Sequence, residues 1–155
     1  MKKTACILVI LLCMSGCTKK EEDVTVKKTT CSMEEKVEEV TFKTTQEIEY
    51  VGDTVRSQKQ SVSAQFKKDD KDAKKKVEAS IKDNEEKYKD IKGMSFEASI
   101  NDENVYQEVI TFDFNTISAN DYGKVTDQKL EGDKVEIDYQ QSKNNLTKQG
   151  FVCSE

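Results

Sequence analysis

Histidine is absent from this chain of 155 residues. Without histidine, neither a Ser-His-Asp triad nor a Cys-His pair can form, and the commonest metal ligand and the usual proton shuttle near neutral pH are both missing. The six glycines are scattered singly, and the sequence contains neither a P-loop nor a GxGxxG motif. A phosphate-cradling loop of the nucleotide-binding kind is therefore not predicted.

Basic stripes and long apolar runs are also lacking. The 25 basic residues are interleaved with 30 acidic ones, which gives a formal net charge of −5. Nucleic-acid-binding proteins usually cluster their lysines and arginines, so no nucleic-acid partner is expected. Charged residues make up 35% of the chain, but apolar residues alternate regularly enough to predict a folded domain.

What the sequence does contain, at its start, is the three-part form of an export signal. The parts are a basic pair, a short apolar core and small residues before a cysteine: Lys2 and Lys3, residues 5–12, then Ser15 and Gly16. A bilayer-spanning helix needs about 20 apolar residues, so this core is typical of a removable signal peptide.

Ser15-Gly16-Cys17 resembles a bacterial lipobox, in which a signal peptidase cuts before a cysteine that carries a diacylglyceryl group. Met14 stands where this motif usually has leucine, and Cys13 follows leucines too bulky for a cleavage site. We expect cleavage between Gly16 and Cys17 and lipid attachment at Cys17. The alternative is an ordinary secretory signal with an incidental thiol.

Lipid on Cys17 has an energetic consequence. Each buried methylene contributes about 0.8 kcal/mol, and two or more acyl chains, as in a diacylglycerol with an added palmitate, anchor a protein stably. The expected location is the extracytoplasmic face of the cell membrane. The expected partners are the membrane, through the anchor, and the lipoprotein-processing enzymes.

The five cysteines can then be assigned. Cys6 and Cys13 leave with the signal and Cys17 takes lipid, so Cys31 and Cys153 remain in an oxidising compartment where disulfides persist. A bridge closing a loop of roughly 100 residues stabilises by up to about 4.7 kcal/mol in the chain-entropy model. The alternative is a redox or metal pair, but there is no CxxC spacing and no histidine, which favours a structural disulfide.

Three segments follow from these assignments: a signal peptide over 1–16, a polar tether over 17–30, and one domain over 31–155. Only Val24 and Val26 are sizeable apolar residues in the stretch from 18 to 30. Fully extended, that stretch spans about 40 Å. Alternatively, the two valines begin an edge strand.

Period-two alternation after Cys31 predicts strands. Val40, Phe42, Ile48 and Tyr50 share one face, Gly52-Asp53 provides turn residues, and a second strand over 54–66 completes an antiparallel hairpin.

The next segment changes to helical spacing. It predicts a helix of about five turns that starts near Asp70 or Asp72 as N-cap and ends with Gly93 as a left-handed C-cap. The apolar stripe comprises Ala73, Val77, Ile81, Tyr88 and Ile91. Its lysine-rich outer face is interleaved with acids, so a solvated face is favoured over a membrane-surface patch.

Strands resume in the last third. "MSFEASI" and "VYQEVITFDF" alternate on either side of a turn at 101–104, "KVEIDY" predicts a final strand, and residues 142–149 suit a short helix ended at Gly150. The aromatic residues of these strands are expected in the core. The predicted fold class is α+β: an antiparallel sheet of about five to six strands with one long helix and a short C-terminal helix packed on it.

This order of elements, with Cys31-Ser-Met, "YKDIKGMSF" and the terminal "LTKQGFVC", resembles the YehR-like bacterial lipoproteins over residues 29–155. The resemblance implies an antiparallel sheet with a helix packed on it, in an envelope lipoprotein. It implies no reaction, so no catalytic residues are carried over.

Chemistry argued from the residues themselves is equally sparse. Zinc would need four ligands from Cys31, Cys153 and carboxylates. The acidic stretches "KDDKD" and "NDENVYQE" lack the order of a calcium-binding loop and suit turns and caps instead. We therefore expect neither a metal nor a cofactor. A carboxylate pair of the glycosidase kind cannot be located among thirty acids.

The expected function is a non-catalytic binding module at the cell envelope, in contact with an envelope protein or peptide. One alternative is a carboxylate-based envelope hydrolase. Another is a small ligand-binding accessory to a transporter, although the chain lacks the length for two ligand-closing lobes.

Overall fold

A computed structural model describes residues 24–37, 40–67, 71–128, 130 and 132–154. The described elements are, in chain order, β1 (Lys27–Val37), β2 (Val40–Val51), β3 (Thr54–Gln65), α1 (Lys71–Tyr88), β4 (Met94–Ile100), β5 (Val105–Asp113), α2 (Ala119–Thr126), α3 (Tyr139–Lys148) and β6 (Val152–Ser154). The strands form an antiparallel sheet in the order β4-β5-β3-β2-β1-β6. The predicted α+β class is thus confirmed.

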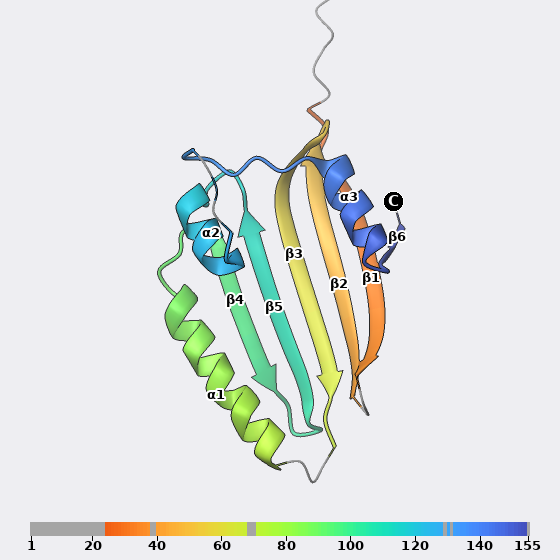
Figure 1. The fold of residues 1–155 in the computed structure, drawn as a ribbon, viewed down its shortest axis with the longest axis vertical. Coiled ribbons are helices and arrows are strands. Elements are labelled where there is room, and N and C mark those ends of the chain that lie inside the picture. The colour runs from red at the N-terminus through yellow and green to blue at the C-terminus, as the bar shows by residue number, and fades with distance from the viewer. Residues whose placement is uncertain (1–23, 38–39, 68–70, 129, 131, 155) are drawn as a thin grey trace, which may run out of the picture.

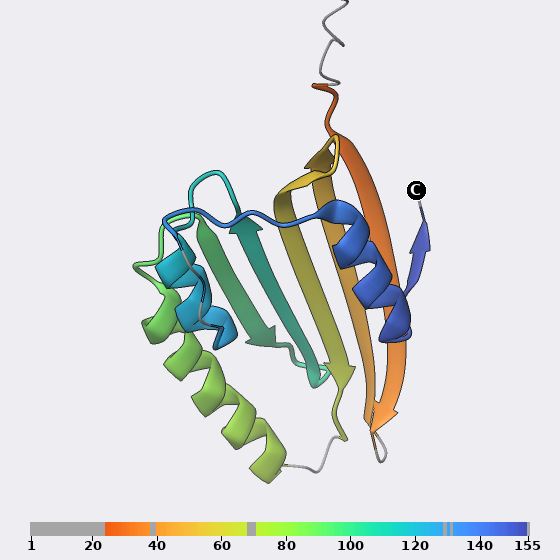
Figure 2. The ribbon, with the colours of Figure 1, turned by 45° about the horizontal axis from the view of Figure 1, so that its top comes forward.

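All three helices lie on one face of the sheet (Figures 1 and 2). α1 covers the β4 edge, where the ring of Tyr88 packs edge-on against Phe96. α2 lies at one end of β4 and β5, and α3 lies over β1 and β2. On β2 and β3 the opposite face carries serines, lysines and glutamates that alternate with the residues facing the helices.

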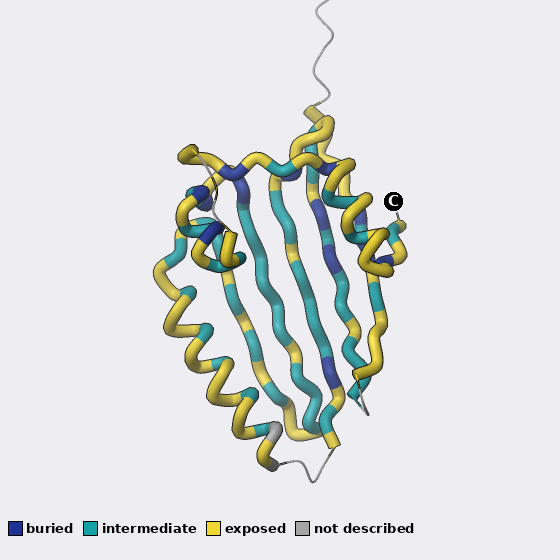
Figure 3. The backbone as a smooth tube through the Cα atoms, viewed as in Figure 1, coloured by how far each residue is buried: buried dark blue, intermediate teal, exposed yellow. Residues whose placement is uncertain are grey.

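The core lies toward one end of the sheet, where Gly52 turns the chain between β2 and β3 (Figure 3). Its buried residues come from the sheet, from the connection between β5 and α2, from both short helices and from the segment between these helices: Ile48, Val55, Phe114, Ile117, Ala119, Val135 and Tyr139. Farther along the same face a row of glutamines replaces apolar side chains. Gln46, only 6% exposed, donates to Gln60 and accepts from Gln58.

Cys31 and Cys153 are joined by a disulfide, as expected. The bond connects directly opposed residues of β1 and β6, so it fastens the last strand to the edge of the sheet. β1 begins at Lys27, which places residues 27–30 of the expected tether inside the sheet. Val24 and Val26 precede the strand and are 79% and 60% exposed.

The expected strand "KVEIDY" is wrong. Residues 134–138 cross the end of the sheet, from α2 toward α3, instead of joining it (Figure 1). They make only isolated pairings, of Asp138 with Thr54 and of Lys134 with Ser118. Alternation persists because Val135 and Ile137 still pack on the core beneath.

The caps of α1 also differ from expectation. Asp72 lies within the helix, and Asp70 falls outside the described residues. Gly93 has φ of +79°, but it lies beyond the end of α1, in the turn into β4. A Cβ there would come within 2.5 Å of the backbone nitrogen of Ile117, so the close approach of two backbones requires glycine.

Candidate ligand-binding site

Two pockets border residues 134–138, which we call the crossing segment. The segment is held by short backbone contacts at both ends. Tyr139 N donates to Asp53 O at 2.8 Å, Val55 N donates to Ile137 O at 3.0 Å, and Ala119 N donates to Asp133 O at 3.2 Å. The crossing segment therefore lies fixed over the end of β3 while its outward side chains remain exposed.

Helix caps flank the segment. The Asp138 carboxylate accepts from Gln141 N at 2.7 Å and begins α3, and the Ser118 hydroxyl accepts from Asp121 N at 3.1 Å and begins α2. Short polar N-cap residues satisfy the free N–H groups of a helix's first turn. The two caps thus determine where the chain enters α2 and where it enters α3.

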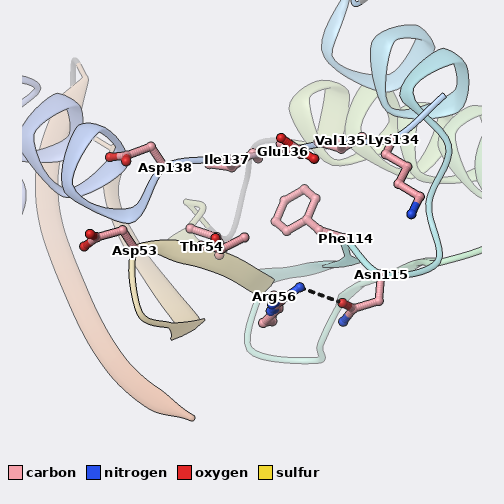
Figure 4. Close-up of a pocket in the computed structure, with 11 residues that line it drawn as sticks. Asp53, Thr54, Arg56, Phe114, Asn115, Lys134, Val135, Glu136, Ile137 and Asp138 are labelled. Atoms are coloured by element: carbon pink, nitrogen blue, oxygen red, sulfur yellow. Dashed lines mark hydrogen bonds between the residues drawn. The ribbon is translucent and has the colours of Figure 1, made fainter. Parts of the chain in front are cut away.

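The outer pocket has a volume of about 640 Å³ (Figure 4). Its apolar lining comes from Val55, Val135, Ile137 and the 7% exposed ring of Phe114. Its charged and polar lining comes from Asp53, Thr54, Arg56, Asn115, Lys134, Glu136 and Asp138. Of these, Arg56 Nη1 donates to Asn115 Oδ1 at 3.4 Å.

Asn115 is positioned by a tight turn after β5. The Asp113 carboxylate accepts from the Thr116 hydroxyl at 2.6 Å and from Asn115 N at 3.0 Å. These hydrogen bonds, the one from Thr116 foremost, hold the pKa of Asp113 below its ordinary value.

The inner pocket, on the helix side of the crossing segment, has a volume of about 860 Å³. Its lining combines uncharged polar side chains with charged ones: Tyr122, Gln128, Gln141, Ser142 and Asn145, together with Asp133, Lys134, Glu136 and Asp138. Burial raises the pKa of Tyr122, whose ring packs edge-to-face on Phe112 and Phe114 at centroid distances of 5.2 and 5.5 Å. Phe114 therefore contributes to the outer pocket and supports the inner one.

The sequence predicted none of these lining residues as site residues. The site residues that it did predict lie elsewhere: the disulfide of Cys31 and Cys153 joins β1 to β6, and neither cysteine lines the two pockets. Gly16 and Cys17 fall outside the described residues. Asp138 could have indicated the site, because aspartate is a preferred N-cap residue and α3 begins directly after it. The predicted strand over "KVEIDY" obscured this signal.

Electrostatics elsewhere favour ionised carboxylates. The pKa of Glu47 is lowered, first by its hydrogen bond from Lys28 Nζ at 2.7 Å, and that of Asp121 is lowered, first by Lys124. The Tyr106 hydroxyl donates to Glu108 at 2.6 Å. The pKa of Tyr106 is raised, mainly by burial and secondly by this hydrogen bond.

Within the ranges that the structure describes, no group of three or more cysteine, aspartate or glutamate side chains is placed to hold a metal ion. None of the described helices is long and apolar enough to span a bilayer.

Comparisons with known proteins give a family and a fold. Residues 29–152 match the family described as "Protein of unknown function (DUF1307)". None of the curated proteins matches the chain.

Two solved structures share the fold. An NMR structure of the Escherichia coli protein YehR is 19% identical with a TM-score of 0.58, covering 82% of this chain and 91% of its own. An NMR structure of a Streptococcus pneumoniae TIGR4 protein is 15% identical with a TM-score of 0.56, covering 99% of this chain and 98% of its own. The expected YehR-like resemblance is confirmed, and at these identities it shows the fold alone.

Proposed function

The chain belongs to the DUF1307 family of proteins of unknown function. We propose that it is a lipid-anchored, non-catalytic binding module at the extracytoplasmic face of the membrane. The observation that carries the binding role is the pair of pockets along the crossing segment. Ligand sites are concave, and in these two pockets a few apolar side chains lie among a larger number of polar and charged groups that could orient a bound molecule.

Two features support the location. The first is the signal peptide and lipobox ending at Cys17. The second is the disulfide between Cys31 and Cys153, a bond that persists in oxidising compartments and is rare in the cytosol.

The anchor would attach near the pockets. Lys27, the first residue of β1, pairs with Tyr50 beside the β2–β3 turn, and Asp53 of that turn lines the outer pocket. At about 3.5 Å per residue, the chain from Cys17 to Lys27 spans at most about 35 Å. The pocket-bearing end of the domain would therefore lie toward the membrane.

A carboxylate-based hydrolase is the second candidate, because Asp53, Glu136 and Asp138 line one pocket. Paired carboxylates can act as acid and base or nucleophile in glycoside hydrolysis. However, Asp138 Oδ1 accepts from Gln141 N as the cap of α3, which holds this carboxylate in one orientation and leaves one of its oxygens for a ligand.

Photo-crosslinking on intact cells tests the binding role. A photoreactive residue replacing exposed Glu136 should capture one reproducible neighbour, identified by mass spectrometry. The matched control replaces exposed Lys59 in β3, which lies outside both pockets. Equal capture at both positions, or none at Glu136, would contradict the proposal.

A further inference from the structure

The outer pocket separates opposite charges. Asp53 and Asp138 lie together at one end of it, where Tyr139 N donates to Asp53 O and Asp138 pairs with Thr54. Arg56 and Lys134 lie farther along it: Arg56 lies below the Phe114 ring, and Lys134 lies on the far side of that ring from the two aspartates (Figure 4).

Two chain segments line opposite sides of the pocket, residues 53–56 and the crossing segment. Both run from an acidic residue to a basic one in the same direction. From the β2–β3 turn into β3 the order is Asp53 to Arg56, and along the crossing segment it is Asp138 to Lys134. An extended chain advances about 3.3 Å per residue, so the acidic and basic backbone positions are at most about 10 Å apart on one side and about 13 Å apart on the other. The pocket is therefore dipolar along its length.

These charges do not neutralise one another. Among the residues that the structure describes, Asp53, Arg56 and Lys134 form no ion pair, and the one hydrogen bond of the Arg56 side chain goes to the neutral Asn115. Unpaired opposite charges facing a shared cavity leave both groups available to a ligand.

We infer that the outer pocket binds a zwitterion, with an ammonium group at Asp53 and Asp138 and an anionic group at Arg56 and Lys134. The inference rests on the proposed binding function and names its ligand class. A lone anion would gain from the two cations but meet the acidic end, and a lone ammonium would meet the opposite conflict. Exposed Glu136, between Asp138 and Lys134 in the crossing segment, is a third acid in the lining. Its charge would further favour binding of the ligand's ammonium group.

The same chemistry occurs in free zwitterions and in zwitterionic lipid headgroups. The first test is calorimetric titration of the full-length chain carrying Cys17→Ala, with its disulfide intact. Phosphoethanolamine is compared with ethanolamine and inorganic phosphate, and 6-aminohexanoate is compared with hexylamine and hexanoate. We expect at least one zwitterion to bind about tenfold more tightly than either of its single-charge counterparts. Equal binding, or no binding of either zwitterion, would overturn the inference.

Binding to lipid vesicles distinguishes a lipid headgroup from a free zwitterion as the ligand. Retention of the same protein on phosphatidylethanolamine vesicles, but not on phosphatidylglycerol vesicles, would support a lipid headgroup. Tight binding of the soluble zwitterion without such retention would support a free ligand.

Charge-removing variants test the polarity. Asp53→Asn should weaken zwitterion binding about fivefold and reduce its preference over inorganic phosphate, whereas Arg56→Gln should reduce the preference over ethanolamine. Lys59→Gln, on the far side of β3, is the matched control and should change neither. If Asp53→Asn and Arg56→Gln altered both preferences alike, the proposed orientation would be wrong.

The two proposals fail separately. If no zwitterion binds but Glu136 still captures a neighbour on cells, the binding module stands and only the ligand class is rejected.

Discussion

At the scale of single residues, the hydroxyl groups of Thr29 and Tyr139 connect α3 to the sheet. Their oxygens are 2.7 Å apart, and the residues are 0% and 2% exposed. The Tyr139 ring also stacks on Tyr50 with centroids 3.6 Å apart. The hydrogen bond therefore fixes the first residue of α3, directly after the crossing segment.

Tyr139→Phe should lower the free energy of unfolding by about 1–3 kcal/mol, because it leaves the buried Thr29 hydroxyl without a partner. Thr29→Val is the matching variant. The double variant should lose less than the sum of the two single losses, as measured by urea unfolding. Strict additivity would show that the two hydroxyls are not coupled.

Gly93→Ala should destabilise the fold about 1–3 kcal/mol more than Gly52→Ala. Both glycines have positive φ, +79° and +58°, so the backbone cost is similar. A Cβ on Gly52 meets nothing within 4 Å, whereas one on Gly93 meets the backbone of Ile117. Equal losses in thermal or urea unfolding would contradict the close approach.

Asp113 makes a prediction about acid stability. Its pKa is lowered in the folded state, so its stabilising effect is complete above the ordinary value of 3.8 and is lost as the pH falls through the folded value. Asp113→Asn should therefore flatten the decline in unfolding free energy below about pH 4. An unchanged acid slope in that variant would show that the turn does not hold the carboxylate.

At the scale of elements, the sequence predicts what neighbouring residues determine. The β2–β3 hairpin and α1 each carry a continuous apolar period, and the structure contains both. The C-terminal helix was predicted over 142–149 from the glycine that ends it, and the structure has it as α3 over Tyr139–Lys148. α2 was missed because eight residues with a glycine inside give little helical signal. The crossing segment was misassigned because alternation reports which side chains face the core, not whether a strand lies alongside to pair with.

The disulfide makes the element-scale prediction. β6 has three residues and pairs with β1 alone, so replacing Cys31 and Cys153 by alanine should free it first. We expect stability to fall by about 2–5 kcal/mol, with amide exchange accelerating most over residues 152–154. Uniform acceleration across the sheet would instead indicate that the bond stabilises the fold globally.

At the scale of the whole molecule, the site is assembled from distant segments. The outer pocket draws on the β2–β3 turn, the end of β5 and the crossing segment, which the sheet order brings together. Sequence periodicity gave the strands but not their order, so no lining residue could be selected from sequence. The membrane location, in contrast, can be predicted from sequence because it depends on a local motif, the lipobox that ends at Cys17.

The proposed membrane location depends on lipid attachment at Cys17, which the intact mass of the protein taken from its own host would reveal. We expect a membrane-associated chain that begins at Cys17, carries a diacylglyceryl group there, and has Cys31 and Cys153 oxidised. A cytosolic chain that retains residues 1–16 and free thiols would contradict it.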